Sequence, residues 1–193
     1  MPPEPFTSLR DHIDAIESAG LLQHINNAHW NLEIGAITEQ VAFSGKPRAL
    51  LFDSIVDYNP GFRVATNLHV SRDLQALALG MPLGVSGVDL VKDWRSRTSK
   101  LERLPPLEVN DGPIRENVLT GDDIDLFSFP APQWRAPDGG RYIGTGDVTF
   151  TTDTEGGWVN AAPYRAQLFG PKRMTIEIAE THHGKQHLKS FWE

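Results

Sequence analysis

The sequence has 193 residues, of which 39% are hydrophobic and 22% are charged, an ordinary balance for a folded soluble protein. Its net charge of −7 argues against a general nucleic-acid binder, whose signature is a basic surface. There is no cysteine, which excludes disulfides, thiolate zinc sites and a cysteine nucleophile.

The first hundred residues alternate between helical and strand-like patterns. Apolar residues recur every three or four positions in some segments, and short apolar runs separate those segments. Helices are expected over 7–20, 32–43 and 71–80, and strands over 21–25, 49–56 and 62–70. This alternation predicts a compact α/β unit over about the first 80 to 100 residues.

The chain changes character after residue 100. Prolines fix φ and lack an N–H, so the proline-rich segment 101–117 predicts an extended connector. Residues 141–170 predict two long strands joined by the turn 152–157, and the alternation in 173–179 predicts a third strand with one buried face. A helix begins at residue 184 and reaches residue 193 without a cap or a turn, so we expect the chain to be cut short.

Several function classes lack their sequence signatures. There is no GxGxxG, no GxxxxGK[ST] and no GxSxG, which argues against a Rossmann dinucleotide site, a phosphate loop and a serine-hydrolase elbow. No apolar run approaches the roughly 20 residues of a membrane span. The first residues, MPPEPFTSLRD, do not resemble a signal peptide. We therefore expect a cytoplasmic protein with no membrane or nucleic-acid partner.

Two polar residues stand out in the apolar segment 156–170, GGWVNAAPYRAQLFG. Asn160 and Arg165 are five positions apart, and residues at odd spacing on a continuous strand point to opposite faces. A surface strand would explain them without any function.

Two further candidates, His182 and His183, follow a predicted strand and precede a helix, a junction where ligands often bind. A polar turn with two solvated histidines is the alternative. A histidine beside an asparagine and a carboxylate suits Mn²⁺.

The spacing of these residues resembles that of the UbiD-type decarboxylases, which use prenylated FMN. In that family a strand carries an Asn, then an Arg five residues later, and a His eighteen residues beyond the Arg. Asn160, Arg165 and His183 keep both intervals, and Thr145 matches a Thr fifteen positions before the Asn. The segment 129–143, FPAPQWRAPDGGRYI, is similar to the family's proline-rich lead-in. The segment beginning VATNLHV resembles a strand–helix pair of its N-terminal domain.

The resemblance implies a role for each matching position. Asn160 and His183 would bind a Mn²⁺ that bridges to the cofactor phosphate, and the Ala161 carbonyl would bind K⁺. Arg165 would lie over the flavin and hold the substrate carboxylate. The remaining cofactor-facing positions are Thr145, Ala162, Pro163, Tyr164 and His182. Arg suits this task because its planar fork grips a carboxylate with two hydrogen bonds.

The resemblance also implies the architecture and the partners. We expect an α+β chain with an N-terminal α/β domain over 1–104 and, over 105–193, the first part of a β-rich split-barrel domain that binds prenylated FMN. The substrate would be a small aromatic or acrylic acid that undergoes reversible, non-oxidative decarboxylation. A flavin prenyltransferase would supply the cofactor, and the assembly would be a homodimer or a higher homo-oligomer.

The family's third metal ligand and its proton-transfer carboxylates, all Glu, would lie beyond residue 193. We therefore expect the chain to be the N-terminal part of an enzyme and inactive by itself. A non-catalytic flavin-binding module is an alternative, as is a subunit whose partner chain supplies the missing carboxylates. The residues do not distinguish a fragment from a natural short subunit, nor do they identify the acid.

Overall fold

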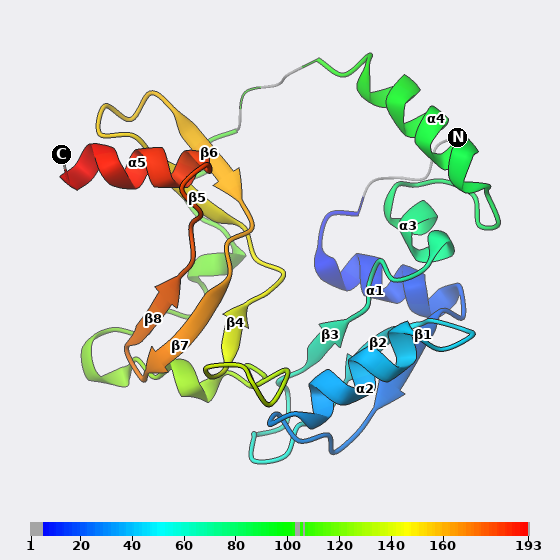
Figure 1. The fold of residues 1–193 in the computed structure, drawn as a ribbon, viewed down its shortest axis with the longest axis horizontal. Coiled ribbons are helices and arrows are strands. Elements are labelled where there is room, and N and C mark those ends of the chain that lie inside the picture. Colours follow the sequence, from blue (N-terminus) through cyan, green and yellow to red (C-terminus); the bar gives the residue numbers. More distant parts are fainter. Residues whose placement is uncertain (1–5, 103–104, 106, 193) are drawn as a thin grey trace. The chain divides into compact units, whose positions relative to one another are not determined.

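The structure is a computed structural model that describes residues 6–102, 105 and 107–192. The chain forms two compact units, each of which mixes helices and strands (Figure 1), so the predicted α+β class is confirmed. The N-terminal unit comprises residues 1–28, 37–55 and 59–119, and the C-terminal unit comprises 29–36, 56–58 and 120–193. The domain division at residues 104 and 105 stays a prediction.

The N-terminal unit is built on a three-stranded sheet. Its strands are β1 (Leu22–Ile25), β2 (Ala49–Phe52) and β3 (Val64–Thr66), in the order β1-β2-β3. Strand β2 runs parallel to β1 and antiparallel to β3. All four residues of β2 are buried, as expected for a central strand covered on both faces.

Helices α1 (Leu9–Ser18) and α3 (Arg72–Ala78) pack on this sheet and on each other. Ser8 caps α1 by accepting a hydrogen bond from the Asp11 N–H. Ile16, Ala49 and Leu74 are fully buried and form the centre of the core. Burying a side chain such as Ile16 stabilises the fold by about 1.5–3 kcal/mol.

Two further helices complete the N-terminal half of the chain. Helix α2 (Glu33–Ala42) has its first four residues in the C-terminal unit and the rest in the N-terminal unit. Helix α4 (Gly87–Thr98) was not expected from the sequence, although Ser86 caps it by accepting from the Asp89 N–H. None of the α4 residues is buried, so this helix contributes no side chain to the core.

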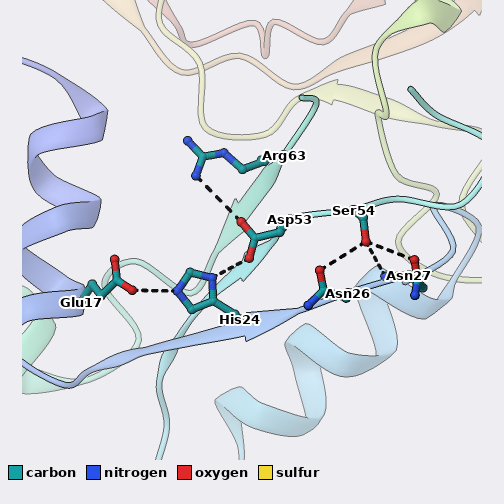
Figure 2. A network of polar contacts seen from close by, with 7 residues as sticks. All are labelled: Glu17, His24, Asn26, Asn27, Asp53, Ser54 and Arg63. Atoms are coloured by element: carbon teal, nitrogen blue, oxygen red, sulfur yellow. Dashed lines mark hydrogen bonds and ion pairs between the residues drawn. The ribbon is translucent and has the colours of Figure 1, made fainter. Parts of the chain in front are cut away.

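A network of polar side chains ties α1 to the sheet of the N-terminal unit (Figure 2). The His24 imidazole lies between two carboxylates, with Nδ1 2.5 Å from Asp53 Oδ2 and Nε2 3.1 Å from Glu17 Oε1. Arg63 lies 3.8 Å from the other Asp53 oxygen. Hydrogen bonds to Asp53 first, and to Glu17 second, raise the pKa of His24. The imidazole therefore links the helix to the sheet.

The strands of the C-terminal unit form a sheet and a separate hairpin. The sheet has the order β4-β7-β8, and β5 pairs with β6. The bounds are β4 (Tyr142–Gly144), β5 (Thr149–Thr152), β6 (Val159–Ala162), β7 (Ala166–Gly170) and β8 (Arg173–Ile176). Between residues 120 and 192 the described strands close no barrel.

Two expectations about these strands are wrong. The two long strands are four short ones, because the chain leaves the ladder at 145–148 and again at 163–165, where Pro163 has no N–H to donate. Strand β8 has no buried face, since all four of its residues are exposed. Its alternating pattern is present, but no described part of the chain covers its apolar side.

Arg141 joins the short segments 29–36 and 56–58 to the rest of the C-terminal unit. Its guanidinium lies 4.2 Å from the Trp30 ring centroid, 5.5 Å from that of Phe127 and 5.6 Å from that of Tyr58. Its Nε donates to the Ala131 carbonyl at 2.7 Å, and its Nη2 donates to the Tyr58 hydroxyl. These contacts combine cation–π attraction with hydrogen bonding.

The remaining elements are short turns and the last helix. Within the predicted connector 101–117, residues 103, 104 and 106 lie outside the described residues, and the rest carries one short 3-10 helix and no strand. The 3-10 helices span Pro113–Arg115, Gly121–Asp123 and Leu126–Ser128. Helix α5 (His183–Trp192) packs on the β5–β6 hairpin. Of the helices in the described ranges, none has the length and apolarity to cross a bilayer.

Candidate functional site

The β5–β6 hairpin places Asn160 at the centre of the candidate site. The antiparallel register puts Asn160 directly opposite Thr151, so their side chains are cross-strand neighbours on one face. The Asn160 amide nitrogen donates to Thr151 Oγ1 at 3.2 Å and to the Tyr164 hydroxyl at 3.2 Å. These bonds use both N–H groups of the amide. Among the described residues, the carbonyl oxygen Oδ1 has no hydrogen-bond partner, so it is free to bind a cation.

Tyr164 connects this strand to the first turn of α5. Its side chain is only 3% exposed, and its hydroxyl accepts from the backbone N–H of Gly184 at 3.1 Å. A Cβ on Gly184 would lie 2.6 Å from that hydroxyl oxygen, so the close approach requires a glycine. His183 is the first residue of α5 and precedes Gly184. The Tyr164 hydroxyl thus links Asn160 of β6 to Gly184, the residue that follows His183.

Two histidines of α5 contact the same tryptophan. The Trp158 ring centroid lies 5.0 Å from that of His183 and 4.5 Å from that of His187, in edge-to-face geometry. His183 is exposed, whereas His187 is 2% exposed and places its Nδ1 2.9 Å from Thr151 Oγ1. The His187 Nε2 atom is buried without a hydrogen-bond partner in the described part of the chain.

Arg165 lies outside this hydrogen-bonded cluster. It lies in the break between β6 and β7, so the alternation of a continuous strand does not set its direction relative to Asn160. Its Nη2 lies 3.1 Å from Glu177 Oε2, and both side chains are more than 60% exposed. The guanidinium therefore already pairs with a solvent-exposed carboxylate. An exposed ion pair of this kind contributes about 0–1 kcal/mol to the stability of the fold.

The remaining predicted site residues surround Asn160 and Tyr164 in sequence or in space. Ala161 and Ala162 complete β6, and Pro163 ends it. The exposed His182 ring stacks near the Tyr164 ring, with 5.8 Å between centroids. Thr145 is exposed in the bend after β4.

The donor chemistry of this cluster fits part of a Mn²⁺ site. An amide oxygen and an imidazole nitrogen are both suitable ligands, and both are neutral, so a bound ion would keep its charge for a phosphate. The described residues contain no group of three or more His, Cys, Asp or Glu side chains placed to hold a metal. Asn160 and His183 supply only two donors, so the ion would need further ligands.

Sequence reasoning missed three residues of this cluster: Thr151, Trp158 and His187. The predicted helix began at residue 184, whereas α5 begins at His183 in the structure, which places His183 and His187 four positions apart on one face. The partnership of His187 with Thr151, 36 residues earlier, had no signal in the sequence.

Two family models match the chain. Residues 13–96 match the 3-octaprenyl-4-hydroxybenzoate carboxy-lyase N-terminal domain, and residues 107–193 match the Rift-related domain of the same carboxy-lyase. Together these two matches cover most of the sequence. They include every residue singled out above as a site candidate.

Individual relatives agree with the family models. A pyrrole-2-carboxylic acid decarboxylase from Pseudomonas aeruginosa is 31% identical, over 90% of this chain and 36% of its own length. The vanillic acid decarboxylase of Sedimentibacter hydroxybenzoicus, in its closed form, is 28% identical with a TM-score of 0.84, over 97% of this chain and 40% of its own.

A third relative was solved with a cofactor. It is an evolved dimeric form of the UbiD-class enzyme HmfF from Pelotomaculum thermopropionicum in complex with prenylated FMN. It is 28% identical with a TM-score of 0.77, over 96% of this chain and 40% of its own. This chain thus spans about two fifths of the length of the relatives it matches. Because the two carboxy-lyase models cover it almost from end to end and these relatives share its fold, the chain belongs to the UbiD family.

Proposed function

We propose that the protein carrying this chain catalyses the reversible, non-oxidative decarboxylation of an α,β-unsaturated or aromatic carboxylic acid with prenylated FMN. Family membership and the decarboxylases among the relatives support this proposal. The observation that carries it is the hydrogen-bonded link from Asn160 through Tyr164 to Gly184. That link ties the strand of one proposed ligand to the helix that begins with the other.

In this proposal Asn160 and His183 hold Mn²⁺, and the Ala161 carbonyl holds K⁺. The free Oδ1 of Asn160 and the exposed imidazole of His183 support the assignment, because both atoms can reach an ion without breaking a described hydrogen bond. Thr145, Ala162, Pro163, Tyr164 and His182 would line the flavin. Prenylated FMN, when bound, would supply the electron sink for the pair released as CO₂ leaves.

Arg165 would bind the substrate carboxylate. Its contact with Glu177 supports this role, since the guanidinium already pairs with a carboxylate. A substrate carboxylate can displace Glu177 at little cost, because the Arg165–Glu177 pair is solvent-exposed and therefore weak. A substrate carboxylate held by two hydrogen bonds would replace a single contact. Arg165 would thereby orient the bond that breaks.

A second candidate is a non-catalytic flavin-binding module, or a subunit that needs a partner chain to supply carboxylates. It is favoured because the described residues contain no group of three or more His, Cys, Asp or Glu side chains placed to hold a metal. Glu180, which lies three residues before His183, is also a poor proton donor. Hydrogen bonds from Lys189 and Lys185 lower the pKa of Glu180, so that carboxylate stays ionised at neutral pH and has no proton to give.

The proposal is tested by co-expressing the full-length gene with a flavin prenyltransferase, which we propose as the cofactor supplier. The purified protein should show the absorption of the modified flavin and release CO₂ from at least one member of a panel of aryl and acrylic acids. Flavin binding without turnover on any acid would favour the second candidate. The native mass of the same sample tests the proposed homodimer or higher homo-oligomer.

A further inference from the structure

The orientation of the Asn160 carboxamide decides whether this residue can bind a cation. An amide held by both N–H groups presents its oxygen, whereas an amide turned by 180° about its last bond presents two N–H donors and repels a positive ion. The two orientations have nearly the same shape, so packing alone does not choose between them. The choice must come from the hydrogen-bonding partners, which are Thr151 and Tyr164.

Thr151 can fix the amide only if its hydroxyl accepts from Asn160. A hydroxyl has one hydrogen to donate, and it can act as an acceptor as well. In the structure His187 Nδ1 lies 2.9 Å from Thr151 Oγ1 and can accept that hydrogen. When Nδ1 carries no proton, the Thr151 hydrogen points at His187, and its oxygen is left to accept from the Asn160 amide. The chain of donors then runs from Asn160 through Thr151 to His187.

The surroundings of His187 hold the imidazole in place. The residue is 2% exposed, and the Trp158 ring lies 4.5 Å away, at 88° to the imidazole plane. A neutral imidazole with its proton on Nε2 leaves Nδ1 as the acceptor. The buried Nε2 has no hydrogen-bond partner among the described residues, and a perpendicular aromatic neighbour is the kind of group toward which a ring N–H can point.

We infer that Thr151 and His187 are positioning residues, which orient the Asn160 carboxamide so that its oxygen faces the metal. The inference rests on the proposed function, since it assigns these residues to the same Mn²⁺ site. Neither residue touches the ion. They act through Asn160, and outer partners of this kind typically change metal affinity by about ten- to hundredfold when they are removed.

The test uses the full-length protein and Mn²⁺ alone, with the free ion measured by electron paramagnetic resonance during a titration. Thr151→Val removes the hydroxyl at nearly constant shape and should weaken Mn²⁺ binding about tenfold or more, whereas Thr151→Ser should restore it. Thr152→Val is the matched control, because Thr152 is the next residue of β5, is exposed and points to the other face. His187→Leu should weaken binding, and His187→Asn, which keeps an acceptor near Nδ1, should retain more of it.

A second set of variants, made in Asn160→Ala protein, distinguishes positioning of the amide by Thr151 from a purely structural role of Thr151. In Asn160→Ala protein the amide is absent, so Thr151→Val should have no further effect on Mn²⁺ affinity, although any effect on thermal stability would persist. Mn²⁺ binding that is equally tight in wild type and Thr151→Val would overturn this inference and leave the proposed function standing. Wild-type protein that binds no Mn²⁺ would overturn the proposed function, and this inference with it.

Discussion

Replacing Gly184 by alanine tests the contact that joins strand and helix at the candidate site. By helix propensity alone the change should be favourable, because alanine is better than glycine inside a helix by up to about 1 kcal/mol. The structure instead predicts that Gly184→Ala destabilises the fold. An added Cβ would lie 2.6 Å from the Tyr164 hydroxyl oxygen and 2.9 Å from two of its ring carbons.

The clash cannot be relieved cheaply. Tyr164 is buried, its ring is rigid, and its hydroxyl is held by hydrogen bonds from Asn160 and from Gly184 itself. Overpacking of this kind destabilises by about 1–3 kcal/mol. If the tyrosine moves away, the buried N–H of residue 184 loses its acceptor, at a similar cost of about 1–3 kcal/mol. We therefore expect a net loss of about 1–3 kcal/mol.

Urea unfolding of the full-length protein measures this loss. Gly157→Ala is the matched control, because a Cβ at Gly157 meets nothing within 4 Å. That control should unfold within about 0.5 kcal/mol of the parent, as surface substitutions usually do. A Gly184→Ala protein as stable as the parent, or more stable, would refute the close approach of Tyr164 to α5.

Three further predictions concern other parts of the chain. Arg141→Lys keeps the charge but loses the planar fork, so urea unfolding should show a loss of about 1–3 kcal/mol; an unchanged midpoint would contradict the anchoring role. Arg165→Lys should lower kcat/KM of the loaded enzyme at least about tenfold, or about 1.4 kcal/mol, with flavin content nearly unchanged; activity within about twofold of the parent would identify Arg165 as a surface residue. Stability should also depend on pH through two histidines. The pKa of His24 is raised, so its contribution is complete below about pH 6.5 and is lost as the pH rises through the raised value. Burial, and secondarily His69, lowers the pKa of His12, so its contribution is present above about pH 6.5 and is lost on acidification. His24→Gln should flatten only the alkaline side of a plot of urea midpoint against pH, and loss of the acid side instead would reverse the assignment.

Much of the fold follows from local patterns. The helical spacing in 7–20 and 71–80 and the apolar runs at β1 and β2 mark elements that the structure contains. Helix α4 was missed although Val88, Val91 and Trp94 recur at helical spacing, and all three are exposed in the structure. The long strands of 141–170 were overestimated, because apolar residues continue through positions where the hydrogen-bonded ladder stops.

The candidate site was predictable only in part. The intervals between Asn160, Arg165 and His183 carry the resemblance to the family, and they are visible in the sequence. The hydrogen bonds of Tyr164 and His187 join residues 20 and 36 positions apart, and no local pattern encodes them. They depend on α5 packing against the β5–β6 hairpin, which is a tertiary contact.

The most direct test of the central claim is the metal and flavin content of a His183→Ala variant. The full-length protein is purified from cells that also express a flavin prenyltransferase, and Mn²⁺ and flavin are measured per chain. If His183 and Asn160 hold the ion that anchors the cofactor phosphate, both contents should fall together, with Mn²⁺ affinity about ten- to hundredfold weaker. A His69→Ala control, which removes an imidazole from the N-terminal unit, should keep both. Normal Mn²⁺ and flavin in His183→Ala would contradict the account.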